Sequence, residues 1–171
     1  MPPLLVRRTY LEMRTPGELV PAREPAPDAR IERLGGCAVS FWRYLYSEVG
    51  RAYRWTDRLT WSDAEVLEYL NDPSITLHVL YVDHAPAGYY ELRRHADGSV
   101  EIAYFGLLPE YLGQGLGGWM LTRAVRDAWE RGGNRVWLHT CTLDHEAALP
   151  NYTQRGFKEF KTECYEIPSG G

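Results

Sequence analysis

The residues best suited to chemistry form a glycine-rich turn. Four glycines lie close together within it, three of them at alternate positions: Gly113, Gly115, Gly117 and Gly118. Because glycine has no Cβ, the backbone N–H groups of such a turn can approach a ligand closely. A helix is expected to begin here, and the free N–H groups of its first turn carry positive partial charge. The turn therefore suits a phosphate or pyrophosphate, although a purely structural turn would explain the same glycines.

Two familiar phosphate-binding motifs fit this turn poorly. A nucleoside-triphosphate loop ends in Gly-Lys-Ser or Gly-Lys-Thr, whereas this turn continues as Gly118-Trp119-Met120. A dinucleotide fingerprint is satisfied formally by Gly113, Gly115 and Gly118. That motif should follow its strand directly within a βαβ unit, and here residues 109–112 intervene after a predicted meander. A third ligand class is indicated by a longer stretch of sequence.

Residues 100–117 closely resemble the signature strand, loop and helix start of the GNAT superfamily of N-acetyltransferases. That signature has Gln or Arg, two residues, Gly, one residue, then Gly or Ala. Gly115 and Gly117 fill the two small positions. Leu112 stands where the family usually has Arg or Gln, which removes one side-chain contact to the cofactor. The resemblance then implies that the pyrophosphate is held by backbone N–H groups.

A second block, residues 145–157, resembles the C-terminal helix and turn of the same superfamily. The positions that match are Ala148, Tyr152, Gly156 and Phe157. His145 differs from the family, which often has Asn there. Pro150 is compatible with a helix if it lies in the first turn. The two blocks together are far more specific than the glycine turn alone.

The resemblance implies acetyl-CoA as the acyl donor, no metal, and direct attack by an amine in a ternary complex. It assigns the pantetheine arm to the backbone of Leu107 and Leu108, and the developing oxyanion to the Leu107 N–H. The residues assigned to the cofactor are Leu107, Leu108, Gly113, Gln114, Gly115, Leu116, Gly117, Gly118 and His145.

Two residues are candidates for proton transfer. Tyr152 matches the usual general acid of the family, a phenol beside the departing sulfur. Glu101 resembles a glutamate of the histone-acetylating branch that removes the amine proton through water. Glu91 and His139 are the alternatives for the base. Each of these also has an ordinary structural explanation as a packed or exposed side chain.

The acceptor side of such a fold is built from its first two helices and the loop between them. This stretch is rich in aromatic residues, and Tyr44, Tyr53 and Trp55 are the candidates to line an amine pocket. Three arginines flank it and could bind an acceptor carboxylate or the phosphates, or form a solvated face: Arg51, Arg54 and Arg58.

Four functions remain as alternatives. Acetylation of a small primary amine or amino-acid-like compound is the leading hypothesis. Acetylation of a protein lysine or N-terminus gains from Glu101, but the bulky aromatic loop would narrow a peptide groove. A cofactor-binding regulator without catalysis is disfavoured by the presence of both Glu101 and Tyr152. A dinucleotide-dependent oxidoreductase is the most distant alternative.

Length, charge and cysteine content constrain the number of domains, the partners and the location of the protein. The 171 residues suit a single domain, 1–171, with 168–171 as a frayed tail. The formal charge of −4 disfavours a nucleic-acid partner. Three cysteines without a paired spacing predict reduced thiols in a cytoplasmic protein rather than disulfides or a zinc site. No apolar run is long enough for a membrane span or a signal peptide. A homodimer is one option for the assembly.

The elements that must position these residues follow from the hydrophobic periodicity. Alternating or β-branched runs predict strands at 4–13, 75–82, 88–93, 100–108 and 136–140, and a last strand or hairpin at 157–167. Helical spacing predicts helices at 38–49, after Ser62, in the segment that ends at Gly132-Gly133, and after His145. We therefore expect an α/β fold with a mixed, largely antiparallel sheet and helices on both faces. The GNAT resemblance adds a splayed strand pair at the cofactor site.

Overall fold

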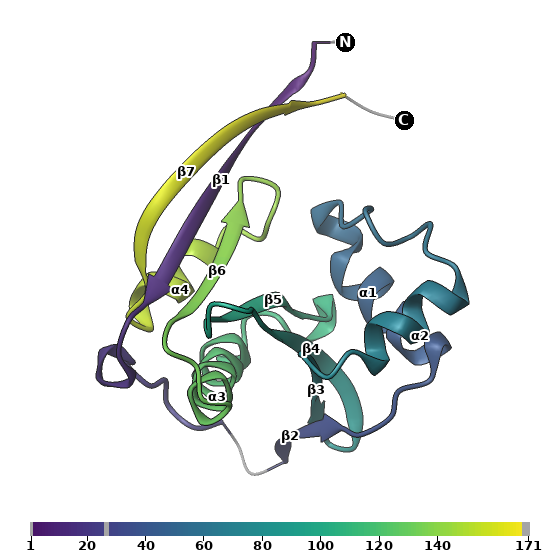
Figure 1. Ribbon diagram of the computed structural model, residues 1–171, viewed down its shortest axis with the longest axis horizontal. Helices are drawn as coiled ribbons and strands as arrows, with labels where there is room; N and C mark the ends of the chain where they lie inside the picture. Colours follow the sequence, from purple (N-terminus) through teal and green to yellow (C-terminus); the bar gives the residue numbers. More distant parts are fainter. Residues whose placement is uncertain (1, 26–27, 169–171) are drawn as a thin grey trace.

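The computed structural model describes residues 2–25 and 28–168, so residues 169–171 of the expected tail lie outside it. The described chain forms one seven-stranded sheet with the strand order β2-β3-β4-β5-β6-β1-β7 (Figure 1). The strands are β1 Leu4–Met13, β2 Ala29–Leu34, β3 Ile75–Val82, β4 Ala85–Arg94, β5 Val100–Leu107, β6 Val136–Cys141 and β7 Lys158–Ile167. The helices are α1 Val39–Gly50, α2 Asp63–Asn71, α3 Leu116–Glu130 and α4 Ala148–Gln154, with short 3-10 turns η1 Pro16–Glu18, η2 Arg51–Tyr53 and η3 Pro109–Tyr111.

The sheet is antiparallel except at one place. Strands β3, β4 and β5 form the expected meander, and β6, β1 and β7 are also joined antiparallel. Among the described strands, only β5 and β6 run parallel, because α3 carries the chain back across the sheet between them. The expected mixed and largely antiparallel architecture is confirmed.

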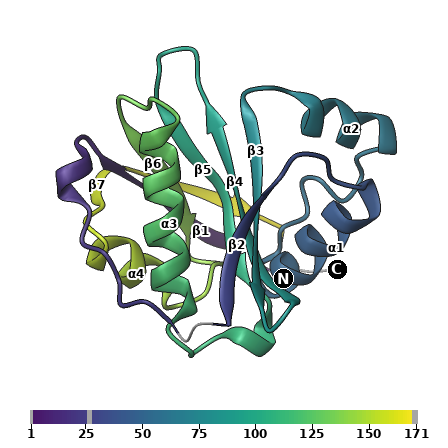
Figure 2. The ribbon, with the colours of Figure 1, turned by 90° about the horizontal axis from the view of Figure 1, so that it is seen from below.

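Helices cover both faces of the sheet, and each pair encloses its own core. Figure 2 shows α3 and α4 on one side of the strands and α1 and α2 on the other. On the α3 side the apolar stripe Leu121, Val125 and Ala128 packs against the sheet. On the α1 side the buried cluster is mostly aromatic and includes Trp42 and Tyr46. The two faces therefore differ in chemistry as well as in sequence.

Helix α2 begins where its sequence predicts. The Ser62 hydroxyl accepts from the Glu65 N–H, and the Glu65 carboxylate accepts from the Ser62 N–H, which completes a capping box. Such a cap satisfies two backbone donors that the first helical turn would otherwise leave without partners. The start of α2 also fixes the end of the loop that leads from α1, residues 51–62.

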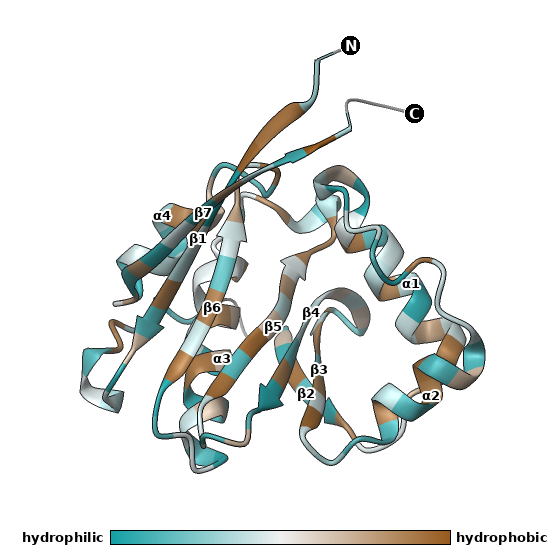
Figure 3. Ribbon diagram, turned by 45° about the horizontal axis from the view of Figure 1, so that its top comes forward, coloured by the Kyte–Doolittle hydropathy of each residue, from teal (hydrophilic) through white to brown (hydrophobic). Residues whose placement is uncertain are grey.

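Strands β1 and β7 form a long ribbon that extends past the body of the molecule, with both termini at the same end (Figures 1 and 3). The start of β1 is apolar in Figure 3, and Leu5 is largely exposed there. Tyr165 and Ile167 of β7 line the main cleft. The ribbon therefore forms one wall of that cleft.

Two elements differ from the sequence-based expectation. Strand β2 was not predicted, because its charged residues Arg30, Glu32 and Arg33 hide the alternation and it pairs only with β3 at the sheet edge. Helix α4 has seven residues rather than about ten, and its third residue is Pro150. Strand β7 is a single strand, which is one of the two alternatives that the sequence left open for this segment.

Two further observations concern the described residues. The three cysteines, Cys37, Cys141 and Cys164, are all free thiols. Among residues 2–25 and 28–168, no helix combines the length and apolar character needed to cross a membrane.

Candidate active site

The site is centred on the place where β5 and β6 separate. The two strands pair at only two positions, Val100 with Val136 and Glu101 with Trp137. Beyond Glu101 the strands diverge, and this fork is the splayed pair that the family resemblance predicts. The remaining length of β5 keeps its hydrogen bonds to β4 on one edge, and no strand of the described chain pairs with its other edge.

The register of β4 and β5 shows which backbone groups face the fork. Leu107 lies opposite Gly88, and the next N–H, from Leu108, donates to the Ala87 carbonyl oxygen at 2.8 Å. In an antiparallel ladder this makes Leu107 a non-hydrogen-bonded position. Its own N–H and C=O therefore point away from β4, toward the space that β6 has left.

Leu108 does not share this position. Its N–H is used by Ala87, and its side chain is 5% exposed within the aromatic core on the α1 side. It does not line the cleft, whereas Leu107 does. We therefore correct the expected cofactor contact of Leu108 to a structural role, which is to fix the register that turns Leu107 outward.

A cleft of about 1440 Å³ extends over the fork and is lined by many residues of the expected site. One end is lined by Leu107, Gly113, Gly117, Gly118, His145 and Tyr152. The other end is lined by Tyr53, Trp55, Asp57 and Tyr104, with Glu101 and His139 also in the lining. The structure thus brings together two segments that are far apart in the chain, the 51–62 loop and the glycine turn.

The glycine turn has the open backbone that an anion site requires. Gly113 and Gly115 have φ values of +75° and +77°, and apart from their chain neighbours no atom of residues 2–25 and 28–168 lies within 4 Å of where their Cβ atoms would be. Gly115 is the N-cap of α3, with no side-chain cap and no acidic residue in the first turn. The first N–H groups of α3 are therefore available to a ligand.

Three residues of the turn have different roles from one another. Gly117 lines the cleft, and its Cβ position is 3.8 Å from Leu107. Leu116 is buried in the core below α3 and anchors the turn. Gln114 donates to the Glu110 carbonyl oxygen at 3.1 Å, and with Gly115 it lines a second, smaller cavity rather than the cleft.

Tyr152 lies on α4 and is 7% exposed, yet it lines the cleft. Its ring packs edge-on against Phe105 of β5 and Phe157, with centroids 6.1 and 6.3 Å away. Burial, with a smaller contribution from the charge of Asp144, raises the pKa of the Tyr152 phenol well above its usual value. The phenol therefore stays protonated, which suits a proton donor.

His145 precedes α4 and also lines the cleft. Its Nδ1 accepts from the Ala147 N–H at 3.0 Å, which fixes the ring. Tyr53 of the loop after α1 meets this ring edge-on, with centroids 6.3 Å apart. This contact joins the two ends of the cleft.

Glu101 lies at the fork, with 14% of its side chain exposed. The nearest partner is His95, whose Nε2 is 2.9 Å from a carboxylate oxygen of Glu101. His139 of β6 faces the same cleft, and burial, followed by the charge of Arg8, lowers its pKa. His139 is therefore neutral near pH 7 and able to accept a proton.

Glu91, the other expected alternative for the base, is fully buried and does not line the cleft. Its two carboxylate oxygens accept from the indole N–H of Trp42 at 2.8 Å and from the Arg58 guanidinium at 2.7 Å. A carboxylate held in this way cannot reach an acceptor amine. Glu91 is a structural residue.

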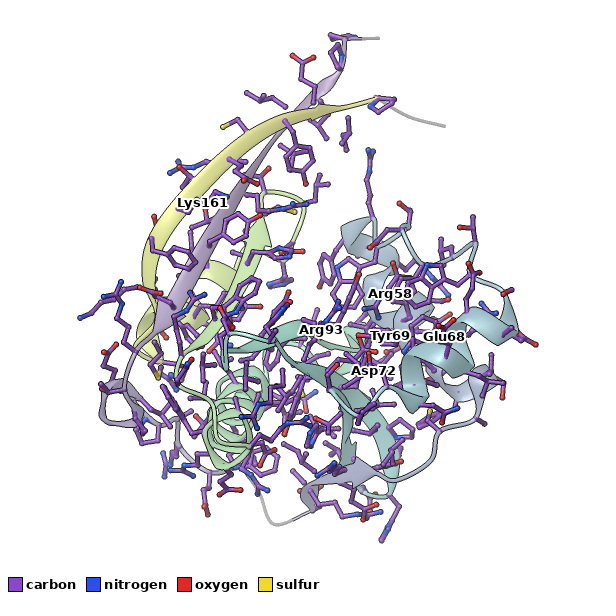
Figure 4. All side chains as sticks on the ribbon, in the orientation of Figure 1. Arg58, Glu68, Tyr69, Asp72, Arg93 and Lys161 are labelled. Atoms are coloured by element: carbon purple, nitrogen blue, oxygen red, sulfur yellow. The ribbon has the colours of Figure 1, made fainter. Side chains whose placement is uncertain are left out.

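Arg58 is the centre of this structural unit, which we name the Arg58 cage. Glu91 neutralises its charge, and although burial opposes ionisation, the attraction of Glu91 raises the pKa of the guanidinium. Figure 4 shows Arg58 and Tyr69 together on the α1–α2 side of the sheet. Five aromatic rings have their centroids 3.8 to 6.0 Å from the guanidinium carbon: Trp42, Tyr46, Trp61, Tyr69 and Tyr104. Arg58 is thus used inside the fold, and the cage holds the 51–62 loop in place.

Asp57 is a site residue that the sequence analysis missed. It faces the cleft and accepts hydrogen bonds from the phenols of Tyr46, at 2.8 Å, and Tyr104, at 2.9 Å. Partial burial would raise the pKa of this carboxyl, but the two phenols outweigh it and hold the pKa below its usual value. Asp57 is an ionised and accessible carboxylate in the aromatic end of the cleft. A single acidic residue in a polar loop gives no sequence signal of this.

Two of the three expected acceptor residues, Tyr53 and Trp55, line the cleft. Tyr44 does not, because it points outward from α1, where it is 45% exposed and stacks on Phe41. The structure therefore does not support its expected role in substrate binding. Arg51 forms an ion pair with Glu48 at the surface, and only Arg54 and Arg58 of the three flanking arginines reach the cleft lining.

A comparison with known protein families matches the part of the chain that forms this site. The model of the acetyltransferase (GNAT) family matches residues 42–157, more than half of the chain and all of the fork, the glycine turn and α4. The chain belongs to the GNAT acetyltransferase family.

Relatives of this GNAT protein agree with the assignment. An uncharacterized N-acetyltransferase of Mycobacterium tuberculosis is 31% identical over 106 residues, which cover 62% of this chain and 67% of that protein. A mycothiol acetyltransferase of Corynebacterium aurimucosum is 32% identical over 81 residues, 46% of this chain and 26% of that one.

Among solved structures, a GCN5-related N-acetyltransferase from Kribbella flavida superposes with a TM-score of 0.68 at 22% identity. It covers 96% of this chain, which spans only 59% of that one. An aminoglycoside acetyltransferase from an uncultured soil sample has a TM-score of 0.63 at 18% identity and covers 77% of this chain and 90% of its own. Within the described residues of this GNAT protein, no three His, Cys, Asp or Glu side chains gather as metal ligands.

Proposed function

We propose that this GNAT family member transfers an acetyl group from acetyl-CoA to a primary amine of a small-molecule or amino-acid-like acceptor. The observation that carries the proposal is the fork. It leaves the N–H and C=O of Leu107 without a strand partner, in the same cleft as the glycine turn and Tyr152. A backbone edge, an anion site and a buried phenol are the three groups that a CoA thioester needs.

The residues present fit acetyl-CoA. Pantetheine carries amide groups, and the free N–H and C=O of Leu107 can pair with them as a strand would. Its pyrophosphate suits the uncapped start of α3 beyond Gly113 and Gly115. The turn holds both positions at a positive φ, a left-handed conformation that is strained for any residue with a Cβ. This explains why glycine stands at both positions.

In the proposed reaction a C–N bond forms and the C–S bond of the thioester breaks. The amine proton passes to Glu101 or His139, directly or through water. The Leu107 N–H donates to the carbonyl oxygen as negative charge develops on it. Tyr152 donates its proton to the departing thiolate, and its raised pKa keeps that proton in place until then.

The acceptor end favours a small amine. Asp57 offers an ionised carboxylate to an ammonium group, and Tyr53 and Trp55 offer aromatic faces beside it. The edge-on contact of Tyr53 with His145 narrows this end and disfavours an extended peptide. Two similar proteins are named for the small molecules mycothiol and aminoglycoside, which supports the same acceptor class. A cytoplasmic location and a homodimer stay predictions.

A thiol-release assay tests the function. The purified protein and acetyl-CoA would be mixed with primary amines, amino acids and short lysine peptides, and free CoA would be followed. We expect amine-dependent release with one or more small amines and little with peptides. Release that only peptides support would favour protein acetylation, and the absence of release with every acceptor would refute the proposed transfer.

A further inference from the structure

Arg155 lies directly after α4, and its side chain packs against the start of α3. A Cβ built on Gly118 would be 3.2 Å from the Arg155 Nη1. The backbone of Arg155 is fixed on both sides, because its N–H donates to the Asn151 carbonyl oxygen at 3.1 Å and its C=O accepts from Val20 at 2.9 Å. The guanidinium is therefore held beside the first turn of α3 by the fold.

This guanidinium is incompletely paired within the protein. The Nε of Arg155 is buried and has no hydrogen-bond partner among the described residues. Within the same residues, no carboxylate lies within 4.0 Å of the guanidinium. Burying a charged donor without a partner costs free energy. The buried Nε is closed to a ligand, but the Nη groups of this half-buried side chain are neither buried nor paired within the described residues. Unlike Arg58, which has Glu91 and five rings, Arg155 can therefore bind an anion from outside the chain.

The surroundings of Arg155 select an anion. The α3 start has no side-chain cap and no acidic residue in its first turn, so its positive end faces a second positive charge. A cavity of about 400 Å³ is lined here by Arg155, Gly115 and Gly118. Arg23 and Glu24 also line it, but their charges offset one another, and the cavity therefore keeps a positive balance.

The cavity is continuous in its lining with the main cleft. Gly118, Asn151 and Gln154 line both. A ligand that passes from the fork over the start of α3 would therefore reach Arg155 at its far end. In a CoA thioester the groups beyond the pantetheine arm are the pyrophosphate and the 3′-phosphate.

We propose that Arg155 binds a phosphate group of the CoA moiety, and so supplies from the C-terminal end of α4 the side-chain contact that Leu112 cannot make. This inference rests on the proposed function. It changes the sequence-based expectation that backbone N–H groups alone hold the phosphates. Both the pyrophosphate and the 3′-phosphate have the required chemistry, and the test below separates them.

Calorimetric dissociation constants would be measured for CoA, for dephospho-CoA, which lacks the 3′-phosphate, and for pantetheine, which lacks all phosphates. Arg155→Gln should weaken CoA binding by about tenfold, the effect of one charge-assisted contact, and leave pantetheine binding unchanged. An equal loss for dephospho-CoA assigns the contact to the pyrophosphate. A loss confined to CoA assigns it to the 3′-phosphate.

Two further variants distinguish a lost phosphate contact from misfolding and from a general change in charge. Arg155→Lys keeps the charge and should recover most of the affinity even if Arg155→Gln folds poorly. Arg126→Gln removes an exposed arginine of α3 that lines neither cavity, and it should change CoA affinity by less than twofold. Wild-type affinity for CoA in both Arg155 variants, or an equal loss for CoA and pantetheine, would overturn the inference. Failure of the wild type to bind CoA at all would instead refute the proposed function.

Discussion

The glycine turn with its fork and the Arg58 cage are built on opposite principles. In the cage a buried charge has a carboxylate partner, three phenols and two indoles around it. At the turn and the fork, the first N–H groups of α3 and the backbone of Leu107 are left without partners by the secondary structure. A ligand is therefore needed at the turn and the fork and not in the cage. The groups of the Arg58 cage pair with one another and stabilise the fold, whereas the free backbone groups of the turn and the fork can gain partners only from a ligand.

The largest effect should come from breaking the cage. Arg58→Met would leave Glu91 buried and unpaired, at a cost of about 3–5 kcal/mol in the free energy of unfolding. Urea denaturation would measure this loss.

The double variant Arg58→Met with Glu91→Leu is the matched control. It removes both charges and should regain most of the stability, because a well-packed apolar pair avoids the cost of burying ions. A loss below about 1 kcal/mol in Arg58→Met would show that the cage does not stabilise the fold.

Tyr152→Phe should affect chemistry and not stability or cofactor binding. Removing the proton donor is expected to lower kcat by about 100-fold, with the KM for acetyl-CoA almost unchanged. Steady-state kinetics would show this split. A kcat equal to that of the wild type would exclude Tyr152 as the general acid.

The pH dependence of kcat also tests the role of Tyr152. Because burial raises the pKa of Tyr152, its acid form persists above the usual titration range of tyrosine. We therefore expect wild-type kcat to show no alkaline loss from this group up to about pH 9. An alkaline limb below that pH, absent from Tyr152→Phe, would contradict the raised pKa of Tyr152.

Asp57→Asn should act on the acceptor alone. The change removes the accessible carboxylate that Tyr46 and Tyr104 hold, and about a tenfold rise in the KM of a cationic acceptor is expected, with no change for acetyl-CoA. Asp63→Asn is the control, since this exposed carboxylate pairs with Arg43 outside the cleft. Equal effects of both variants would indicate a general electrostatic effect rather than a contact.

The smallest effect is expected for Tyr44→Ala. This side chain is exposed on α1 and does not line the cleft, so stability should change by less than about 0.5 kcal/mol and kinetics not at all. A large rise in acceptor KM would restore the role that the sequence suggested.

Features that depend on neighbouring residues could be predicted from the sequence, and features that depend on distant contacts could not. The glycine turn and the Tyr152 block are local patterns, and the capping box at Ser62 is too, so each was visible without a structure. The free edge of Leu107 depends on the register of β4 with β5, which no local pattern encodes. Asp57 and Arg155 gain their positions from contacts with residues far along the chain, such as Tyr104 and Gly118. Strand β2 is specified mainly by its pairing with β3.

The most direct test of the account is a titration with CoA followed by backbone amide chemical shifts. We predict that the largest changes fall on the N–H groups of Leu107, Gly115 and Gly117, while the indole N–H of Trp42 in the cage stays unchanged. Saturating CoA that leaves Leu107 and the turn unperturbed, or that shifts only residues outside the cleft, would contradict the account.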